Sequence, residues 1–161
     1  MNNLKRLDRI DIKILECLQE NARITNLELA RRVGLSPSPC HRRLRLIEAS
    51  GLIRQYVTLL DRNAVGLELT AFVEVALRRK DPKSNAAFQK AVQARPEVME
   101  CHIMTGDFDY MLRVAAPDID SFRRFIMNEL LAMPGVDRTR TSISLGEIKY
   151  TTALPLKPSA L

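Results

Sequence analysis

The spacing of apolar residues changes partway along this chain of 161 residues. Before residue 52, apolar positions recur every three or four residues, as on one face of a helix. From Leu67 to Leu77, every second residue is apolar, as in a strand with one buried face. The change predicts two domains, residues 1–61 and 67–161, joined by a linker at 62–66.

Two helices are predicted in the first forty residues. The first begins near Asp8 and repeats its apolar residues every four positions. The second runs from about Asn26 to Val33, because Thr25 and Glu28 have the spacing of a capping box and Gly34 suits the position after a helix end.

Two prolines stand at the start of a third predicted helix, in "GLSPSPCHRRLRLIE". With Ser36 as the N-cap, Pro37 and Pro39 occupy helical positions whose N–H groups have no intrahelical partner. The prolines therefore start the helix, which ends at Gly51. Because Pro39 has no N–H, the hydroxyl of Ser36 is expected to accept its capping hydrogen bond from the N–H of residue 38.

Three helices with a tight glycine turn between the last two are typical of a helix-turn-helix. "LIRQYVTLLD", residues 52–61, predicts a strand or small wing behind the third helix. On a helical wheel, Cys40, Leu44 and Ile47 share an inward face. The opposite face carries Ser38, His41, Arg42 and Arg45.

These outward residues suit a helix that lies in the major groove of DNA. Arginine pairs bidentately with guanine, and serine or histidine can reach base edges or phosphates. Arg43 lies on the flank, where a phosphate contact is expected, and helix N-termini offer N–H groups to phosphates. The alternative is a solvated basic face with an exposed histidine. The predicted DNA-binding set is Thr25, Asn26, Ser36, Ser38, His41, Arg42, Arg43 and Arg45.

The second domain is predicted to be β-α-β-β-α-β, an α+β ferredoxin-like unit. One helix begins with Asp81 as its cap, a hairpin turns at Gly106–Asp107, and a second helix repeats apolar residues from Phe122 to Met133. Helices on one face of an antiparallel sheet leave the other face uncovered, which favours self-association.

The net charge of +6 lies mostly in the first domain, since residues 1–62 hold five of the six net positive charges. This asymmetry favours a polyanionic partner such as nucleic acid, although it could also serve solubility alone. Apolar runs are too short for a membrane span, and the first residues lack the apolar core of a signal peptide, so a soluble cytoplasmic protein is expected.

The chain resembles the Lrp/AsnC, or feast/famine, family of transcriptional regulators. The resemblance covers nearly the whole chain and rests on "LDRIDIKILECLQENARITNLELARRVGLSPSPCHRRLRLIEASGLIRQYVTLLD" and "TGDFDYMLRV". It implies a winged helix-turn-helix that binds a double-stranded DNA operator, followed by a domain that binds amino-acid effectors between subunits and forms dimers, often octamers. The "SPSPC" variant is similar to the leucine-responsive branch, which favours leucine or methionine as effector, with cysteine as a competitor.

The resemblance aligns the family's Gly-x-x-Asp turn with Gly106 and Asp109. N–H groups after Gly106 can hold a carboxylate, and Asp107 or Asp109 can pair with the ammonium group of an amino acid. A plain hairpin turn is the alternative. The predicted effector-binding set is Thr105, Gly106, Asp107, Asp109, Tyr110, Thr139, Thr141 and Ser142.

Other chemistry has weaker support. Cys17, Cys40 and Cys101 are widely spaced and are expected to be free thiols, with no metal-ligand spacing. Redox sensing by Cys40 is the alternative function, because arginines near a helix start can lower the pKa of a thiol. No nucleophile motif or phosphate loop is present, so neither an enzyme nor a cofactor is expected.

Overall fold

The computed structural model describes residues 7–156, which form two compact units. The first unit comprises the described residues within Met1–Thr58 and Lys149–Leu161, and the second is Leu59–Ile148. Residues 149–156 were predicted as part of the second domain, but they group with the first unit. No helix among residues 7–156 is long and apolar enough to cross a membrane.

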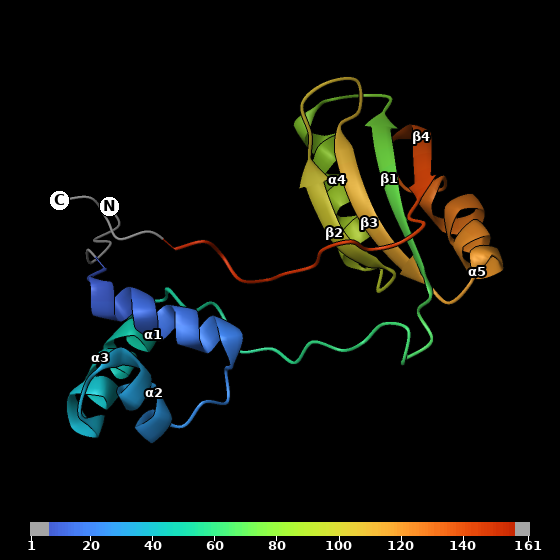
Figure 1. Ribbon diagram of the computed structural model, residues 1–161. Coiled ribbons are helices and arrows are strands. Elements are labelled where there is room, and N and C mark those ends of the chain that lie inside the picture. Colours follow the sequence, from blue (N-terminus) through green and yellow to red (C-terminus); the bar gives the residue numbers. More distant parts are fainter. Residues whose placement is uncertain (1–6, 157–161) are drawn as a thin grey trace. The chain divides into compact units, whose positions relative to one another are not determined.

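The first unit holds the three predicted helices (Figure 1): α1 (Arg9–Glu20), α2 (Asn26–Val33) and α3 (Pro37–Ala49). Their inward faces form one core around Ile14, Leu29 and Cys40, all essentially inaccessible to solvent. Gly34 ends α2 in a left-handed conformation, with φ of 75°, which glycine adopts without steric cost.

The helix caps differ in part from the predictions. Thr25 accepts a hydrogen bond from the Glu28 N–H at 3.2 Å, which is half of the predicted capping box. Both halves of a capping box occur instead at α1, between Asp8 and Asp11. The cap predicted for Ser36 is wrong, because its side chain makes no capping bond. Pro37 fixes the helical start by its own φ preference.

Residues 52–61 do not form the predicted strand; they run without a strand partner in this chain. A strand needs an edge with which to pair, and a unit of three helices offers none. Side chains hold the segment instead: Ile53 packs against the helical core, and the Tyr56 hydroxyl donates to Glu48 at 3.0 Å.

The second unit has the predicted β-α-β-β-α-β order. Its elements are β1 (Leu69–Leu77), α4 (Pro82–Gln93), β2 (Val98–Ile103), β3 (Tyr110–Ala116), α5 (Ile119–Arg124), a π-helical continuation, η1 (Phe125–Leu130), and β4 (Val136–Ile143). The sheet is antiparallel with the order β2-β3-β1-β4 (Figure 1). The last helix is thus not one regular α-helix as predicted, because its second half widens to i→i+5 bonding.

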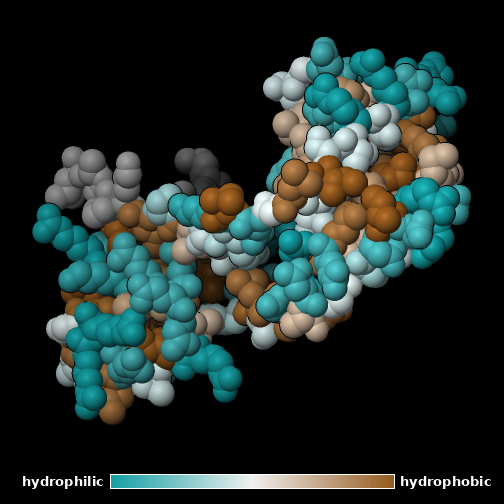
Figure 2. Space-filling model, turned by 45° about the vertical axis from the view of Figure 1, so that its right-hand side comes forward, coloured by the Kyte–Doolittle hydropathy of each residue, from teal (hydrophilic) through white to brown (hydrophobic). Residues whose placement is uncertain are grey.

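Both helical segments pack on one face of this sheet. Val73 and Val75 of β1 share a core with Phe88 of α4 and Phe122 of α5. Residues of alternate register face the other way, and Phe72 among them is 42% exposed. Figure 2 shows a band of hydrophobic side chains on the second unit, whereas the visible surface of the first unit is mostly hydrophilic.

Candidate DNA-contacting helix and effector loop

The turn before α3 is fixed by contacts between the two helices that flank it. The Asn26 amide donates to the Pro37 carbonyl at 3.0 Å and so ties the start of α2 to the start of α3. Of the predicted DNA-binding residues, Thr25 and Asn26 therefore have structural roles as well. Their positions at a helix N-terminus still leave backbone N–H groups directed away from the helix.

The two faces of α3 divide as the helical wheel predicts. Cys40 and Ile47 are buried in the core, and Leu44 is half-buried against it. The opposite residues are exposed: Ser38, His41, Arg42 and Arg45. The Arg45 side chain is 72% exposed, and its Nη1 atom lies 4.0 Å from a carboxylate oxygen of Glu48, which is a long ion pair. The outward face thus offers hydroxyl, imidazole and guanidinium groups to a partner.

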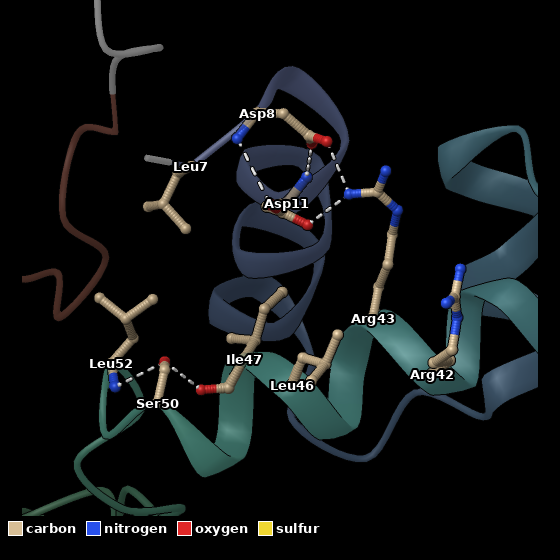
Figure 3. Close-up of a pocket in the computed structure, with 9 residues that line it drawn as sticks. All are labelled: Leu7, Asp8, Asp11, Arg42, Arg43, Leu46, Ile47, Ser50 and Leu52. Carbon is tan, nitrogen blue, oxygen red and sulfur yellow. Dashed lines mark hydrogen bonds and ion pairs between the residues drawn. The ribbon is translucent and has the colours of Figure 1, made fainter. Parts of the chain in front are cut away.

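Arg43 differs from its neighbours on α3. Its Nη1 atom lies 2.6 Å from an Asp8 carboxylate oxygen and 2.8 Å from one of Asp11 (Figure 3). Arg42 lies beside it in the same view and reaches neither carboxylate. Arg43 was predicted to contact phosphate, but in this chain it joins α3 to the first turn of α1.

The electrostatics of this junction are consistent with a stable ion pair. The pKa of Asp8 is lowered by the hydrogen bond from the Asp11 N–H, which outweighs partial burial, and by Arg43. Hydrogen bonds to Asp8 and Asp11 raise the pKa of Arg43 in turn. A hollow of about 370 Å³ lies beside these groups, and Leu46 and Leu52 form part of its apolar wall (Figure 3).

The thiol-sensor alternative is contradicted by the environment of Cys40. The side chain is fully buried, and this burial raises the pKa of the thiol, whereas a sensor needs a lowered one. The wheel position outweighs the nearby arginines, which point away from the core. Within residues 7–156, His, Cys, Asp and Glu side chains nowhere gather in a group that could hold a metal ion.

The predicted effector loop joins β2 to β3 and is closed by backbone bonds around Asp109. The Met104 N–H donates to the Asp109 carbonyl at 2.9 Å, and the Asp109 N–H donates to the Val75 carbonyl at 2.9 Å. Gly106 at the tip has φ of 110°, a conformation that favours glycine. Thr105, Gly106 and Asp107 are all exposed, so the tip of the loop is open to a ligand.

The Asp109 side chain is already bonded within the unit. One carboxylate oxygen accepts the Leu77 N–H at 2.8 Å, and the other lies 2.9 Å from Lys80 Nζ. Burial acts to raise the pKa of Asp109, but these two contacts together hold it below its ordinary value. Asp109 therefore fixes the loop to the end of β1, whether or not it also meets a ligand.

Tyr110 lies in the core and not at the loop surface. It is 2% exposed, and the centre of its ring lies 4.7 Å from the centre of the Phe88 ring. Its hydroxyl donates to Asn85 at 3.0 Å and accepts from Gln89 at 3.1 Å, both on α4. Its polar group is thus directed beneath the sheet, away from the loop tip where an effector was predicted.

The remaining predicted effector residues, on β4, are not all brought together. Thr139 pairs with Val75 across the strands, so β1 separates it from the loop by two strand spacings, about 10 Å. Thr139 and Thr141 share one sheet face, and Ser142 lies on the other. Within one chain these side chains do not converge on the loop.

Phe108 and the arginines of β4 form a cluster that the sequence predictions missed. The guanidinium carbons of Arg138 and Arg140 lie 5.2 and 4.8 Å from the centre of the Phe108 ring, close enough for cation–π attraction. Arg140 also forms a bidentate ion pair with Glu74. The i, i+2 spacing of arginines in "DRTRT" could have indicated that both lie on one sheet face.

The chain matches two protein-family models. Residues 7–54 match the model described as "Winged helix-turn-helix DNA-binding" and residues 70–154 the "Lrp/AsnC ligand binding domain". The leucine-responsive regulatory proteins of Klebsiella pneumoniae and of Escherichia coli K12 are each 44% identical over 153 residues, which is 95% of this chain and 93% of the relative.

Solved structures give the same family. A transcriptional regulator of Neisseria meningitidis, in complex with L-Met, is 46% identical, with a TM-score of 0.89 over 92% of this chain and 96% of that one. An AsnC family regulator of Agrobacterium tumefaciens is 38% identical, with a TM-score of 0.88 over 92% and 97%. With both domains matched in order, the chain belongs to the Lrp/AsnC family of transcriptional regulators, with a winged helix-turn-helix DNA-binding domain followed by the family's ligand-binding domain.

Proposed function

We propose that this protein contacts operator DNA through the outward face of α3. The supporting observation is the contrast along that helix: the Arg43 side chain is held by two carboxylates, whereas the side chains of Arg42 and His41 form no hydrogen bond or ion pair within residues 7–156. A free guanidinium can pair bidentately with guanine without first breaking an internal bond. Ser38, His41, Arg42 and Arg45 are therefore the proposed reading residues, and the N-terminal ends of α2 and α3 the proposed phosphate contacts.

The test compares two double variants that lose the same charge. Arg42→Ala with Arg45→Ala removes two exposed cations from α3, and Arg123→Ala with Arg124→Ala removes two exposed cations from α5. Titration with operator duplex at several salt concentrations should show about 100-fold weaker binding for the α3 variant, with a shallower salt slope, and little change for the α5 variant. Equal losses in both would indicate a general charge effect and contradict the proposal.

The proposed effector is a small amino acid with an apolar side chain, methionine or leucine. The relative from Neisseria meningitidis is in complex with L-Met. In this chain the exposed tip, Thr105 to Asp107, carries free backbone groups after Gly106 that suit a carboxylate. Asp107 is exposed and suits an ammonium group better than Asp109, whose oxygens are bonded to Leu77 and Lys80.

A thermal-shift screen with the twenty amino acids tests this assignment. Methionine or leucine should raise the melting temperature in a concentration-dependent way, because a ligand bound by the folded state stabilises it. Asp107→Asn should weaken the response about tenfold, since an ammonium contact of that kind contributes about 1.4 kcal/mol. No response to any amino acid would contradict the effector proposal and leave the DNA assignment intact.

The uncovered sheet face supports self-association into a homodimer, from which an octamer can be built. That face combines exposed Phe72 with the ion pairs Arg113–Glu100 and Arg140–Glu74. Sedimentation should show dimers or larger assemblies for the parent protein and a shift towards monomer for Phe72→Arg. An unchanged assembly in that variant would place the dimer contact elsewhere.

A further inference from the structure

The described C-terminal segment lies with the first unit, although it follows the last strand of the second. Residues 149–156 run past α1 (Figure 1), and one side chain of that helix bonds to them. Gln19 Nε2 donates to the Leu154 carbonyl at 3.1 Å, and the Leu154 N–H donates to Gln19 Oε1 at 2.6 Å. The two residues are 135 positions apart in the chain.

The side-chain amide of Gln19 thus bonds to both the backbone N–H and the backbone carbonyl of Leu154. Asn and Gln are the side chains that present both an N–H donor and a carbonyl acceptor in one planar group. Leu154 is 69% exposed, and its backbone groups would otherwise bond to water. The contact therefore depends on the geometry of the two hydrogen bonds and not on burial of the leucine side chain. The pairing resembles the exchange of bonds between neighbouring strands.

The residues on either side of Leu154 limit the conformations that the segment can adopt. The Ala153 N–H donates to the Thr151 hydroxyl at 3.1 Å, which constrains the backbone just before Leu154. Pro155 follows, and its fixed φ reduces the conformational freedom that docking removes. Leu156, the last residue described, is half-buried.

We propose that the C-terminal turn of α1, centred on Gln19, is a docking site for the C-terminal segment Thr151–Leu156 of the same chain. The second unit, Leu59–Ile148, is then tied to the DNA-binding unit at both of its ends, through residues 52–58 and through the docked segment. A second tether shortens the free path between the units and restricts their reorientation. Neither DNA nor an effector is needed for this docking.

The experiment places a photoreactive benzoylphenylalanine at position 154 of the full-length protein. This substitution keeps the backbone N–H and carbonyl of the residue, and the exposed side chain leaves room for the probe. After irradiation without DNA or amino acid, the cross-linked peptides are identified by mass spectrometry. Gln19→Ala removes the amide, Gln19→Glu keeps only an acceptor, and Glu16→Ala, at an exposed position one turn earlier, is the matched control.

Cross-links should map to α1 in a product with the mass of one chain. Gln19→Ala and Gln19→Glu should lower their yield about fivefold, because each loses a donor to Leu154, and Glu16→Ala should not. Circular dichroism should show the same helix content in all variants. Equal yields in the parent protein and Gln19→Ala, cross-links away from α1, or a product with the mass of two chains would each overturn the proposal.

Discussion

The two candidate binding regions, the outward face of α3 and the loop between β2 and β3, differ in whether their polar side chains are bonded to other groups of the protein. On α3, Arg42 and His41 have no internal partner within residues 7–156, and one helix presents them in a fixed order. At the loop after β2, Asp109 is bonded to Leu77 and Lys80, and Tyr110 is bonded beneath the sheet to α4. The proposed DNA-binding face of α3 therefore lies within one helix, whereas the proposed effector loop has most of its inward polar groups bonded within its own unit.

This difference has a structural cause. A major-groove helix meets its partner as a convex surface, so its side chains must project freely. A small-molecule site must be concave, with few polar groups held in place. The loop tip is fixed by its bonds but is not enclosed by residues of its own chain, and the β4 residues predicted to complete it lie across β1. The proposed homodimer would supply the remaining walls from a second copy of the chain.

The strongest test of this contrast is Asp109, which is proposed to fix the loop and not to bind the ligand. Asp109→Ala leaves the Leu77 N–H without its acceptor and should destabilise the second unit by about 2 kcal/mol in urea unfolding. Asp109→Asn keeps an acceptor oxygen and loses the charge, so the destabilisation should be about half as large.

The same pair of variants separates structure from ligand binding. If Asp109→Asn abolishes the thermal response to methionine or leucine while the protein stays folded, the carboxylate itself holds the ammonium group. The assignment to Asp107 would then be wrong. A retained response supports Asp109 as a residue that only shapes the loop.

The next largest effect is expected at Arg43. This residue lies on α3, but its side chain is bonded within the protein, as the Asp109 side chain is in the loop. Arg43→Ala should destabilise the first unit by about 1–2 kcal/mol, since two charge-assisted bonds are lost at a partly exposed site. Arg43→Lys should retain part of that stability. Operator affinity in Arg43→Ala should fall with no change in salt slope. A slope reduced by about one would show that Arg43 contacts phosphate after all.

A smaller effect is expected at Tyr110. Tyr110→Phe keeps the packing against Phe88 but leaves Asn85 and Gln89 without their shared partner. The cost should be about 1 kcal/mol in the unfolding free energy of the second unit, with the effector response unchanged. If Tyr110→Phe lost the effector response but kept the stability of the parent protein, Tyr110 would have to be assigned to the ligand site.

Sequence patterns predicted most of the fold because the signals are local. The start of α2 at Asn26, its end at Gly34 and the alternation of β1 all follow from neighbours within four residues. The π-helical turn at Phe125–Leu130 was missed, because apolar spacing alone does not distinguish i→i+5 from i→i+4 bonding. The missing strand at 52–61 shows the same limit, since strand formation depends on a partner that sequence pattern does not reveal.

The candidate sites were predictable to different degrees for the same reason. The outward face of α3 follows from one helical wheel, and the structure exposes all four residues assigned to it. The bonds of Arg43 to Asp8 and Asp11, and of Asp109 to Leu77, join residues that are 32 to 35 positions apart. The charge of Arg43 suggested DNA, but its partner was decided by how α1 packs beside α3.

The smallest predicted effect concerns the pH dependence of that junction. The pKa of Asp8 is held below its ordinary value of 3.8, chiefly by the Asp11 N–H and also by Arg43. A lowered folded-state pKa means that the ionised carboxylate stabilises the fold fully above pH 3.8 and that this contribution is lost as pH falls through the lower value. Asp8→Asn keeps a capping oxygen but has no charge, so it should be about 0.5 kcal/mol less stable at neutral pH. Urea unfolding at successive steps below pH 3.8 should bring the two proteins together; a difference that persists in acid would mean that Asp8 acts through shape and not through charge.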